Sequence, residues 1–238
     1  MDNASYVTLT RMSGLNREMQ VIAHNVANSG TSGFRREGLI FSEFVRGGEG
    51  HEPSISMALG NTRQTSDLQG ALAPTGGAFD MAIEGEGYFQ VETAAGPRLT
   101  RAGSFTPNEA GELVNMDGHR LLDAGGAAIF VPPDAGQIAM SRDGTLSSDG
   151  LPFAQVGLVR PADPVTLSRA AGTLFEVEGD IEPVEAPVIL QGFLEDSNVN
   201  PVLELARMIE VQRAYEQGQR LLDREDERIK NVIQTLGR

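Results

Sequence analysis

The side chains that most often carry chemistry in proteins are scarce in this chain and poorly spaced. His24, His51 and His119 are its histidines, and no two of them stand at the spacing of zinc ligands. The sequence contains no cysteine, so disulfides and thiolate chemistry are not available. A metal site would need carboxylates gathered from distant positions. We therefore expect neither a metal nor a cofactor.

Two short motifs resemble ligand sites but are better explained as turns. Gly85-Glu86-Gly87 begins like a phosphate-binding loop, but a third glycine and a following helix are not indicated. Residues 141–150, SRDGTLSSDG, contain acidic residues at Asp143 and Asp149 but lack the spacing and the terminal Glu of an EF-hand. Paired carboxylates for glycoside hydrolysis could converge from many places, but the sequence singles out no pair. We therefore predict that the chain is not an enzyme.

Charge and hydropathy limit the partners of this chain. Its 238 residues include 19 Lys and Arg against 33 Asp and Glu, a net charge of −14. Binding to nucleic acid or to an anionic membrane surface relies on basic groups, so we predict neither. No apolar run approaches the ~20 residues that span a bilayer, which predicts no membrane insertion. The opening MDNASYVTLTRMSG does not resemble an ordinary cleaved signal peptide. The acidity can also serve solubility alone.

Apolar residues spaced by heptads predict a helix at the N-terminal end of the chain. The pattern predicts a helix over residues 3–26, and Asn28-Ser29-Gly30 is a suitable end for it. Such spacing puts apolar side chains on one stripe, which another helix must cover. The stripe consists of Met12, Leu15, Met19, Ile22 and Val26.

A second heptad pattern predicts a long helix at the C-terminal end. Asn200 is a favourable N-cap, Pro201 suits the first helical position, and the pattern continues to residue 236. Gly218 lies inside this helix and should weaken it by ~1 kcal/mol relative to Ala. The heptad positions are Met208, Tyr215, Leu222, Ile229 and Leu236. The first third is apolar over a wider arc than one partner helix covers, and this arc includes Val202, Leu203, Leu205, Ala206, Ile209 and Val211.

The middle of the chain has a different character. From about residue 79 to residue 193, apolar residues alternate with period two and prolines exclude long helices. Asp117-Gly118, Asp143-Gly144 and Asp149-Gly150 predict tight hairpin turns. We therefore predict many short strands in this region. Residues 31–77 are less regular, with short extended pieces expected at 42–45 and 55–59.

These elements predict an α+β fold in which the terminal helices pair as a coiled-coil-like stalk and an all-β domain is inserted between them. The expected division is a helical part of residues 1–30 and 197–238, a connecting segment of residues 31–77, and a β-rich part of residues 78–196. A stalk of two helices would leave the apolar arc in water. We therefore expect it to be completed by other subunits.

Four stretches of the sequence resemble the family of flagellar rod and hook proteins. They are NVANSGTSGFRR at residues 25–36, FDMAIEGEGYFQV at 79–91, LTRAGSFTPNEAGELVNMDGHRLL at 99–122 and LEDSNVNPVLELARMIEVQRAYE at 194–216. Within the family, the opening residues and the length are most similar to the proximal-rod member. The distal-rod member is the main alternative.

The resemblance implies a structural subunit of the flagellar basal-body rod in the periplasmic space. Its partners would be other rod proteins, copies of itself in a helical assembly, and the flagellar type III export apparatus. The terminal helices would form the inner tube of the rod, and the β domain would face outward. The heptads and the motif together suggest these subunit-interface residues: Met12, Leu15, Met19, Ile22, Asn25, Val26, Asn28, Gly33, Phe34, Val202, Leu205, Met208, Ile209, Tyr215, Leu222 and Ile229.

Two other classes of function remain open from the sequence. A secreted enzyme acting on the cell wall would need a cleft with a perturbed carboxylate, and lytic assays would reveal it. An acidic β-domain binding module would use the helices only to dimerise, and a discrete dimer that never enters a basal body would indicate it.

Overall fold

The computed structural model describes residues 3–46 and 55–236 and divides the chain into two compact units. The helical unit comprises Met1–Asn28, Arg36–Ser66 and Val199–Arg238. The β unit comprises Ser29–Arg35 and Asp67–Asn198. The expected connecting segment, residues 31–77, is therefore shared between the two units. This α+β composition, with two helices and many antiparallel strands, was predicted.

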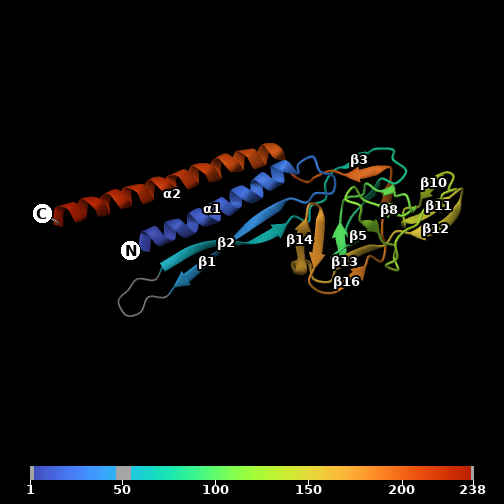
Figure 1. The fold of residues 1–238 in the computed structure, drawn as a ribbon, viewed down its shortest axis with the longest axis horizontal. Helices are drawn as coiled ribbons and strands as arrows, with labels where there is room; N and C mark the ends of the chain where they lie inside the picture. The colour runs from blue at the N-terminus through green and yellow to red at the C-terminus, as the bar shows by residue number, and fades with distance from the viewer. Residues whose placement is uncertain (1–2, 47–54, 237–238) are drawn as a thin grey trace. The chain divides into compact units, whose positions relative to one another are not determined.

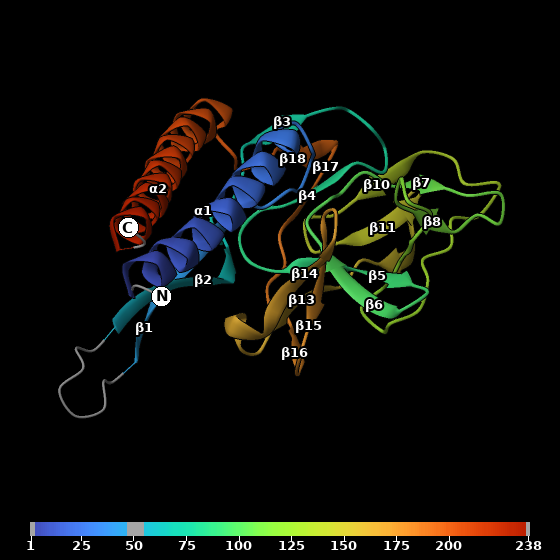
Figure 2. The same cartoon turned by 60° about the vertical axis from the view of Figure 1, so that its left-hand side comes forward.

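Two long helices form the frame of the helical unit. Helix α1 (Asn3–Ala27) and helix α2 (Pro201–Leu236) run antiparallel and side by side (Figures 1 and 2). At about 1.5 Å per residue they are roughly 37 Å and 54 Å long, so the C-terminal part of α2 extends beyond α1. In the described part of the chain, neither helix is long and apolar enough to cross a membrane.

The end of α1 and the start of α2 follow from local chemistry. The side-chain Oδ1 of Asn200 accepts the N–H groups of Val202 at 3.1 Å and Leu203 at 3.2 Å, as an N-cap does. The N–H and side-chain amide of Asn28 both donate to the carbonyl of His24, at 3.2 and 2.9 Å. The predicted cap of α2 is confirmed, and Asn28 closes the last turn of α1.

The helical unit also contains a long antiparallel ladder. Strands β1 (Glu37–Arg46) and β2 (Ile55–Thr65) pair over their whole length, with an irregularity between Ile40 and Phe41. Strand β2 packs against α1 (Figure 1). The ladder is longer than the short extended pieces expected at residues 42–45 and 55–59. Leu39, Ile40 and Phe41 follow one another directly, so the alternation that marks a strand in a sequence is lost here.

The β unit is built around a nine-stranded sheet. Its main path runs β14-β15-β6-β5-β9-β8-β7, and β13 pairs with both β5 and β16. These strands are β5 (Tyr88–Thr93), β6 (Gly96–Thr100), β7 (Thr106–Pro107), β8 (Leu113–Val114), β9 (Arg120–Leu121), β13 (Leu158–Pro161), β14 (Leu167–Ala171), β15 (Leu174–Val177) and β16 (Ile181–Pro183). A short 3-10 helix, η1 (Pro164–Thr166), precedes β14.

Smaller sheets complete the β unit. Strands β10 (Ile138–Met140), β11 (Thr145–Ser148) and β12 (Leu151–Gln155) form one of them. Late strands pair with early ones in the others: β17 (Ile189–Gln191) with β4 (Met81–Ile83), and β18 (Phe193–Glu195) with β3 (Leu72–Pro74). The C-terminal end of this unit is thus needed to complete its first strands.

The predicted Asp-Gly turns are confirmed. Asp117-Gly118 lies between β8 and β9, Asp143-Gly144 between β10 and β11, and Asp149-Gly150 between β11 and β12. At the last of these turns both residues have positive φ, 49° for Asp149 and 82° for Gly150. This is the conformation that the Asp-Gly pair favours in tight hairpins.

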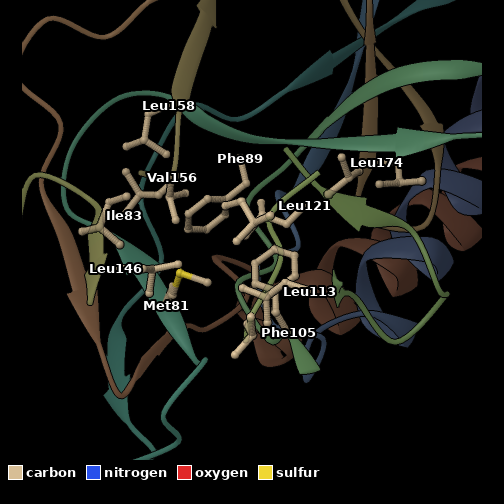
Figure 3. Packing of buried hydrophobic residues seen from close by; sticks show 14 residues of the cluster. Met81, Ile83, Phe89, Phe105, Leu113, Leu121, Leu146, Val156, Leu158 and Leu174 are labelled. Atoms are coloured by element: carbon tan, nitrogen blue, oxygen red, sulfur yellow. The ribbon is translucent and has the colours of Figure 1, made fainter. Parts of the chain in front are cut away.

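The hydrophobic core of the β unit gathers side chains from many of its strands (Figure 3). The rings of Phe89 and Phe105 meet edge to face, with centroids 5.6 Å apart. Strand β4 is buried at all three positions, so the half-buried alternation expected there does not hold. Met81 and Ile83 of β4 are part of the core, so this strand lies inside the unit. The buried core residues are Met81, Ile83, Phe89, Val91, Phe105, Leu113, Leu121, Ile129, Val131, Leu146, Val156, Leu158, Leu174 and Ile189.

Candidate subunit interface

The contact between α1 and α2 occupies many of the residues predicted to lie at a subunit interface. Its buried centre consists of Leu15, Ile22 and Val211. Met19, Val26, Met208, Ala214 and Tyr215 pack around that centre and are partly buried. Met12 lies on the same face of α1 and reaches Gly218 of α2. These side chains hold the chain's own helices together.

An ion pair supports the contact between the two helices. The Nε and Nη2 atoms of Arg207 on α2 lie 2.8 and 2.7 Å from Oε1 of Glu18 on α1. Glu18 is a buried residue, whereas the side chain of Arg207 is half exposed. Because a charged hydrogen bond is directional, this pair restricts sliding of one helix along the other.

A different set of apolar side chains on α2 lies open to solvent, and we name it the exposed α2 surface. Near the start of α2, Val202 is 72% exposed, and near its end Leu236 is 82% exposed. Water contact with so much apolar area is unfavourable, at about 25 cal/mol per Å², which marks a surface suited to a partner. Its members are Val202, Leu203, Leu205, Ile209, Leu221, Ile229, Val232, Ile233 and Leu236. Leu222 is half-buried.

Asn25 is fully buried and joins three elements of the helical unit. Its Nδ2 donates to the carbonyl of Glu37 at 2.8 Å and to Oε2 of Glu204 at 3.1 Å. Its Oδ1 accepts the N–H of Glu37 at 2.9 Å. The other oxygen of Glu204 accepts from Nε of Arg36 at 2.6 Å. Asn25 therefore ties the end of α1 to the start of β1 and the first turn of α2.

Gly33 and Phe34 are packed inside the β unit. The N–H of Gly33 donates to the carbonyl of Glu195 at 2.7 Å. A Cβ on Gly33, whose φ is +71°, would lie 2.2 Å from the backbone nitrogen of Ala102, so only glycine fits. Phe34 is 0% exposed, and the guanidinium of Arg169 lies 4.4 Å from the centre of its ring. A contact role for either residue at a subunit interface stays a prediction.

Arg35, Arg101 and Glu195 form a buried charged cluster that was not among the predicted site residues. Nη2 of Arg35 lies 2.8 Å from Oε1 of Glu195, and its Nη1 donates to the carbonyls of Asp67 and Leu68. Nη1 of Arg101 lies 3.7 Å from the other carboxylate oxygen of Glu195. Arg35 and Glu195 stand inside the sequence blocks that resemble the rod and hook family, but nothing in the sequence pairs residues so far apart.

The predicted interface residues and the buried charged cluster take part in packing and in ion pairs. Within residues 3–46 and 55–236, no three His, Cys, Asp or Glu side chains are placed to hold a metal ion. Apart from Asn28, which ends α1, and Leu222, which is half-buried, the predicted residues fall into two sets. One set is used inside the chain, at the α1–α2 contact, around Asn25, and at Gly33 and Phe34. The other set lies on the exposed α2 surface.

Two family models match the chain. Residues 190–235, which include most of β17, β18 and nearly all of α2, match the C-terminal domain of the flagellar basal body rod FlgEFG proteins. Residues 82–148, from β4 to β11, match the D1 domain of the flagellar hook protein FlgE/F/G family.

Full-length relatives extend this similarity to the whole chain. The flagellar basal-body rod protein FlgF of Caulobacter vibrioides is 37% identical, covering 100% of this chain and 99% of the relative. FlgF of Mesorhizobium japonicum is 38% identical with the same coverage. The flagellar basal-body rod protein FlgG of Bacillus subtilis is 29% identical over 96% of this chain and 97% of its own length.

The chain therefore belongs to the FlgE/F/G family of flagellar rod and hook proteins. Within it, FlgF proteins from three species are 35–38% identical over the full length. The chain is a structural component of the flagellar basal-body rod, as predicted, and not an enzyme.

Proposed function

We propose that this chain is an FlgF-like subunit of the proximal section of the rod, and that it joins the axial drive shaft through its terminal helices. The observation that carries the proposal is the full-length similarity to FlgF proteins. Family membership also favours export by the flagellar type III apparatus and assembly with copies of itself and with other rod and hook proteins.

The exposed α2 surface supports helix-based assembly. Its apolar residues are exposed, and two of them, Ile229 and Leu236, continue the heptad stripe of Met208 and Tyr215 toward the C-terminal end of α2. One patch that binds a different patch on the next subunit produces an open helical array, which is the symmetry of a shaft. The heptad spacing and the α1–α2 contact favour coiled-coil pairing of these helices in the rod. The helical parts, residues 1–30 and 197–238, would then build the tube.

The ion pairs within the helical unit give this surface a rigid support. Arg207 with Glu18, and Arg36 with Glu204, fix the helices and β1 through charged hydrogen bonds. A subunit whose helices keep one register presents the same surface to each neighbour. That constancy is what a shaft under torque requires.

Substitution of Ile233 by aspartate tests the assembly surface. Ile233→Asp places a charge on the exposed α2 surface, while Gln234→Asp places the same charge on the next residue, which is polar and also exposed. Ile233→Asp should keep a wild-type circular dichroism spectrum, because the side chain is exposed, yet be absent from purified hook–basal bodies and leave cells non-motile. Gln234→Asp should assemble normally. Normal incorporation of Ile233→Asp would show that this surface does not mediate assembly.

The copy number of the chain distinguishes the proximal rod from the FlgG-like distal rod. Quantitative mass spectrometry of purified hook–basal bodies should find a few copies per particle, in fixed ratio to other rod proteins. A markedly higher copy number would favour the distal section instead.

A further inference from the structure

The β unit contains a cavity that the rod function does not explain. Its volume is about 530 Å³. Two of its lining residues, Arg35 and Arg101, are almost completely buried, at 1% and 4% exposure. The rest of the lining consists of Asp67, Gln69, Tyr88, the loop Gly85-Glu86-Gly87, and residues from β13 to β14.

The buried charges beside this cavity do not balance. Glu195 is the buried carboxylate that faces both guanidinium groups, so two buried cations share one buried anion. Nε and Nη1 of Arg101 and Nε of Arg35 have no hydrogen-bond partner. Burial lowers the pKa of Arg101 to about 10; Glu195 opposes this effect, and Arg35 adds to it. A buried cation with incomplete compensation is costly to the fold and is stabilised by an added anion.

The guanidinium of Arg101 is held in place for such a contact. Its Nη2 donates to the carbonyl of Gly85 at 2.5 Å, and its Cζ lies 5.5 Å from the centre of the Tyr88 ring. These contacts limit its rotation. A planar guanidinium fixed in this way matches the two oxygens of a carboxylate.

The exposed part of the lining selects among anions. Asp67 and Glu86 also line the cavity and are exposed, and Glu86 lies 3.5 Å from Arg160. Their negative charges disfavour a doubly charged group such as phosphate. The apolar lining residues Pro161, Ala162, Pro164 and Leu167 provide a surface for a small hydrocarbon body.

We propose that this cavity of the β unit binds a singly charged carboxylate with a small apolar body, and that the Arg101 guanidinium is its principal ligand. The carboxylate could belong to a free small acid or to an acidic side chain of another polypeptide. The inference does not depend on the proposed role in the rod, because binding is measured on the isolated chain.

Titration of the wild-type chain with sodium propionate tests the proposal directly. The NMR signals of the arginine Nε–H groups would be followed, with sodium chloride at matched ionic strength and sodium phosphate as comparisons. The Arg101 signal should shift saturably with propionate, with a Kd on the order of 1 mM, as one charged pair and a small apolar contact allow. No saturable shift up to roughly 50 mM, or an equal shift with chloride, would overturn the proposal.

Two variants localise the binding. Arg101→Lys should weaken propionate binding at least about tenfold, because lysine lacks the planar fork. Arg98→Lys is the matched control: Arg98 lies on β6 and pairs with Glu176 at 2.9 Å, outside the cavity lining, so its Kd should match wild type. Equal binding by the two variants would contradict the assignment to Arg101. The wild-type titration decides the proposal even if Arg101→Lys fails to fold.

A blocked Ala-Asp-Ala peptide identifies the source of the carboxylate, with Ala-Asn-Ala as its control. Binding of the aspartyl peptide as tight as that of propionate supports a protein partner. Binding of propionate alone supports a free acid. The proposal is overturned if neither binds.

Discussion

Two neighbouring arginines of this chain serve different units. Arg35 is 1% exposed and pairs with Glu195 in the β unit, whereas Arg36 pairs with Glu204 in the helical unit. Each pair joins a residue near the N-terminal end to one near the C-terminal end. Removal of one partner from a buried pair is far more costly than loss of an exposed pair, because the remaining charge stays buried.

Glu195→Ala should destabilise the β unit by about 3–5 kcal/mol, since Arg35 and Arg101 then lose their shared carboxylate. Urea unfolding measures the change. The control is Glu182→Ala, which breaks a half-exposed pair with Arg160 at 3.3 Å and should cost about 0–1 kcal/mol. A similar effect of both substitutions would contradict a structural role for the buried cluster.

Tyr88 should give the folded chain a characteristic response to alkaline pH. Burial raises its pKa above the ordinary value of 10.0, although the cations Arg35 and Arg101 oppose this. The unfolded chain therefore ionises Tyr88 first, and this residue's contribution to stability is complete below pH 10.0 and is lost as pH rises through the folded-state pKa. The tyrosinate absorbance of wild type minus that of Tyr88→Phe should show a step above pH 10.0. A step centred lower would rule out the raised pKa.

For single residues, the sequence identifies which positions are important better than it identifies what they contact. Asn25, Gly33 and Phe34 are found from a motif, but the motif does not state what they touch. The structure shows that all three are buried within the chain. The sequence does not identify Glu195 as a site residue, because its partner Arg35 is far away in the sequence and no periodicity connects the two.

Local sequence signals predict where helices begin and where turns occur. They do not predict the order of the strands, which depends on pairing between distant segments. The start of α2 at Pro201 and the turns at Asp117, Asp143 and Asp149 depend on a few adjacent residues, and all are confirmed. The order of the strands depends on contacts between distant segments, such as β17 with β4. The full length of the β1–β2 ladder is missed for a local reason, because the consecutive apolar residues Leu39, Ile40 and Phe41 break the alternation that marks a strand.

Gly218 has a packing role within α2. A Cβ at this position would lie 2.9 Å from Cγ and 3.2 Å from Sδ of Met12 on α1. Gly218→Ala should gain up to about 1 kcal/mol of helix propensity and lose most of it to this overlap. The net change in unfolding free energy should therefore be within about 0.5 kcal/mol of zero.

A double-mutant cycle with Met12→Ala separates the two effects on Gly218. In the Met12→Ala background the overlap is gone, so Gly218→Ala should stabilise the helical unit by about 1 kcal/mol. Urea unfolding of the four chains measures this coupling. Equal gains in both backgrounds would show that Met12 does not restrict position 218.

Buried contacts are distributed unevenly along the chain, and the C-terminal part of α2 has few of them. The buried centre of the α1–α2 contact includes Val211, whereas residues 226–236 of α2 are exposed. Helix backbone with few buried contacts opens readily. Amides in residues 226–236 should therefore exchange quickly in the isolated chain and slowly in assembled basal bodies, as measured by hydrogen exchange and mass spectrometry. Slow exchange in the isolated chain would indicate that this end needs no neighbour.

The order of residues along the chain has a consequence for its synthesis. The β unit needs β17, β18 and Glu195 to complete its early strands and to neutralise Arg35, and the helical unit needs α2 to cover α1. A ribosome delivers all of these last. Phe34 and Arg35 leave the ribosome early. They therefore cannot form all of their native contacts until translation is nearly finished. Neither unit can complete its folding early, and the polypeptide stays incompletely folded until α2 has been synthesised.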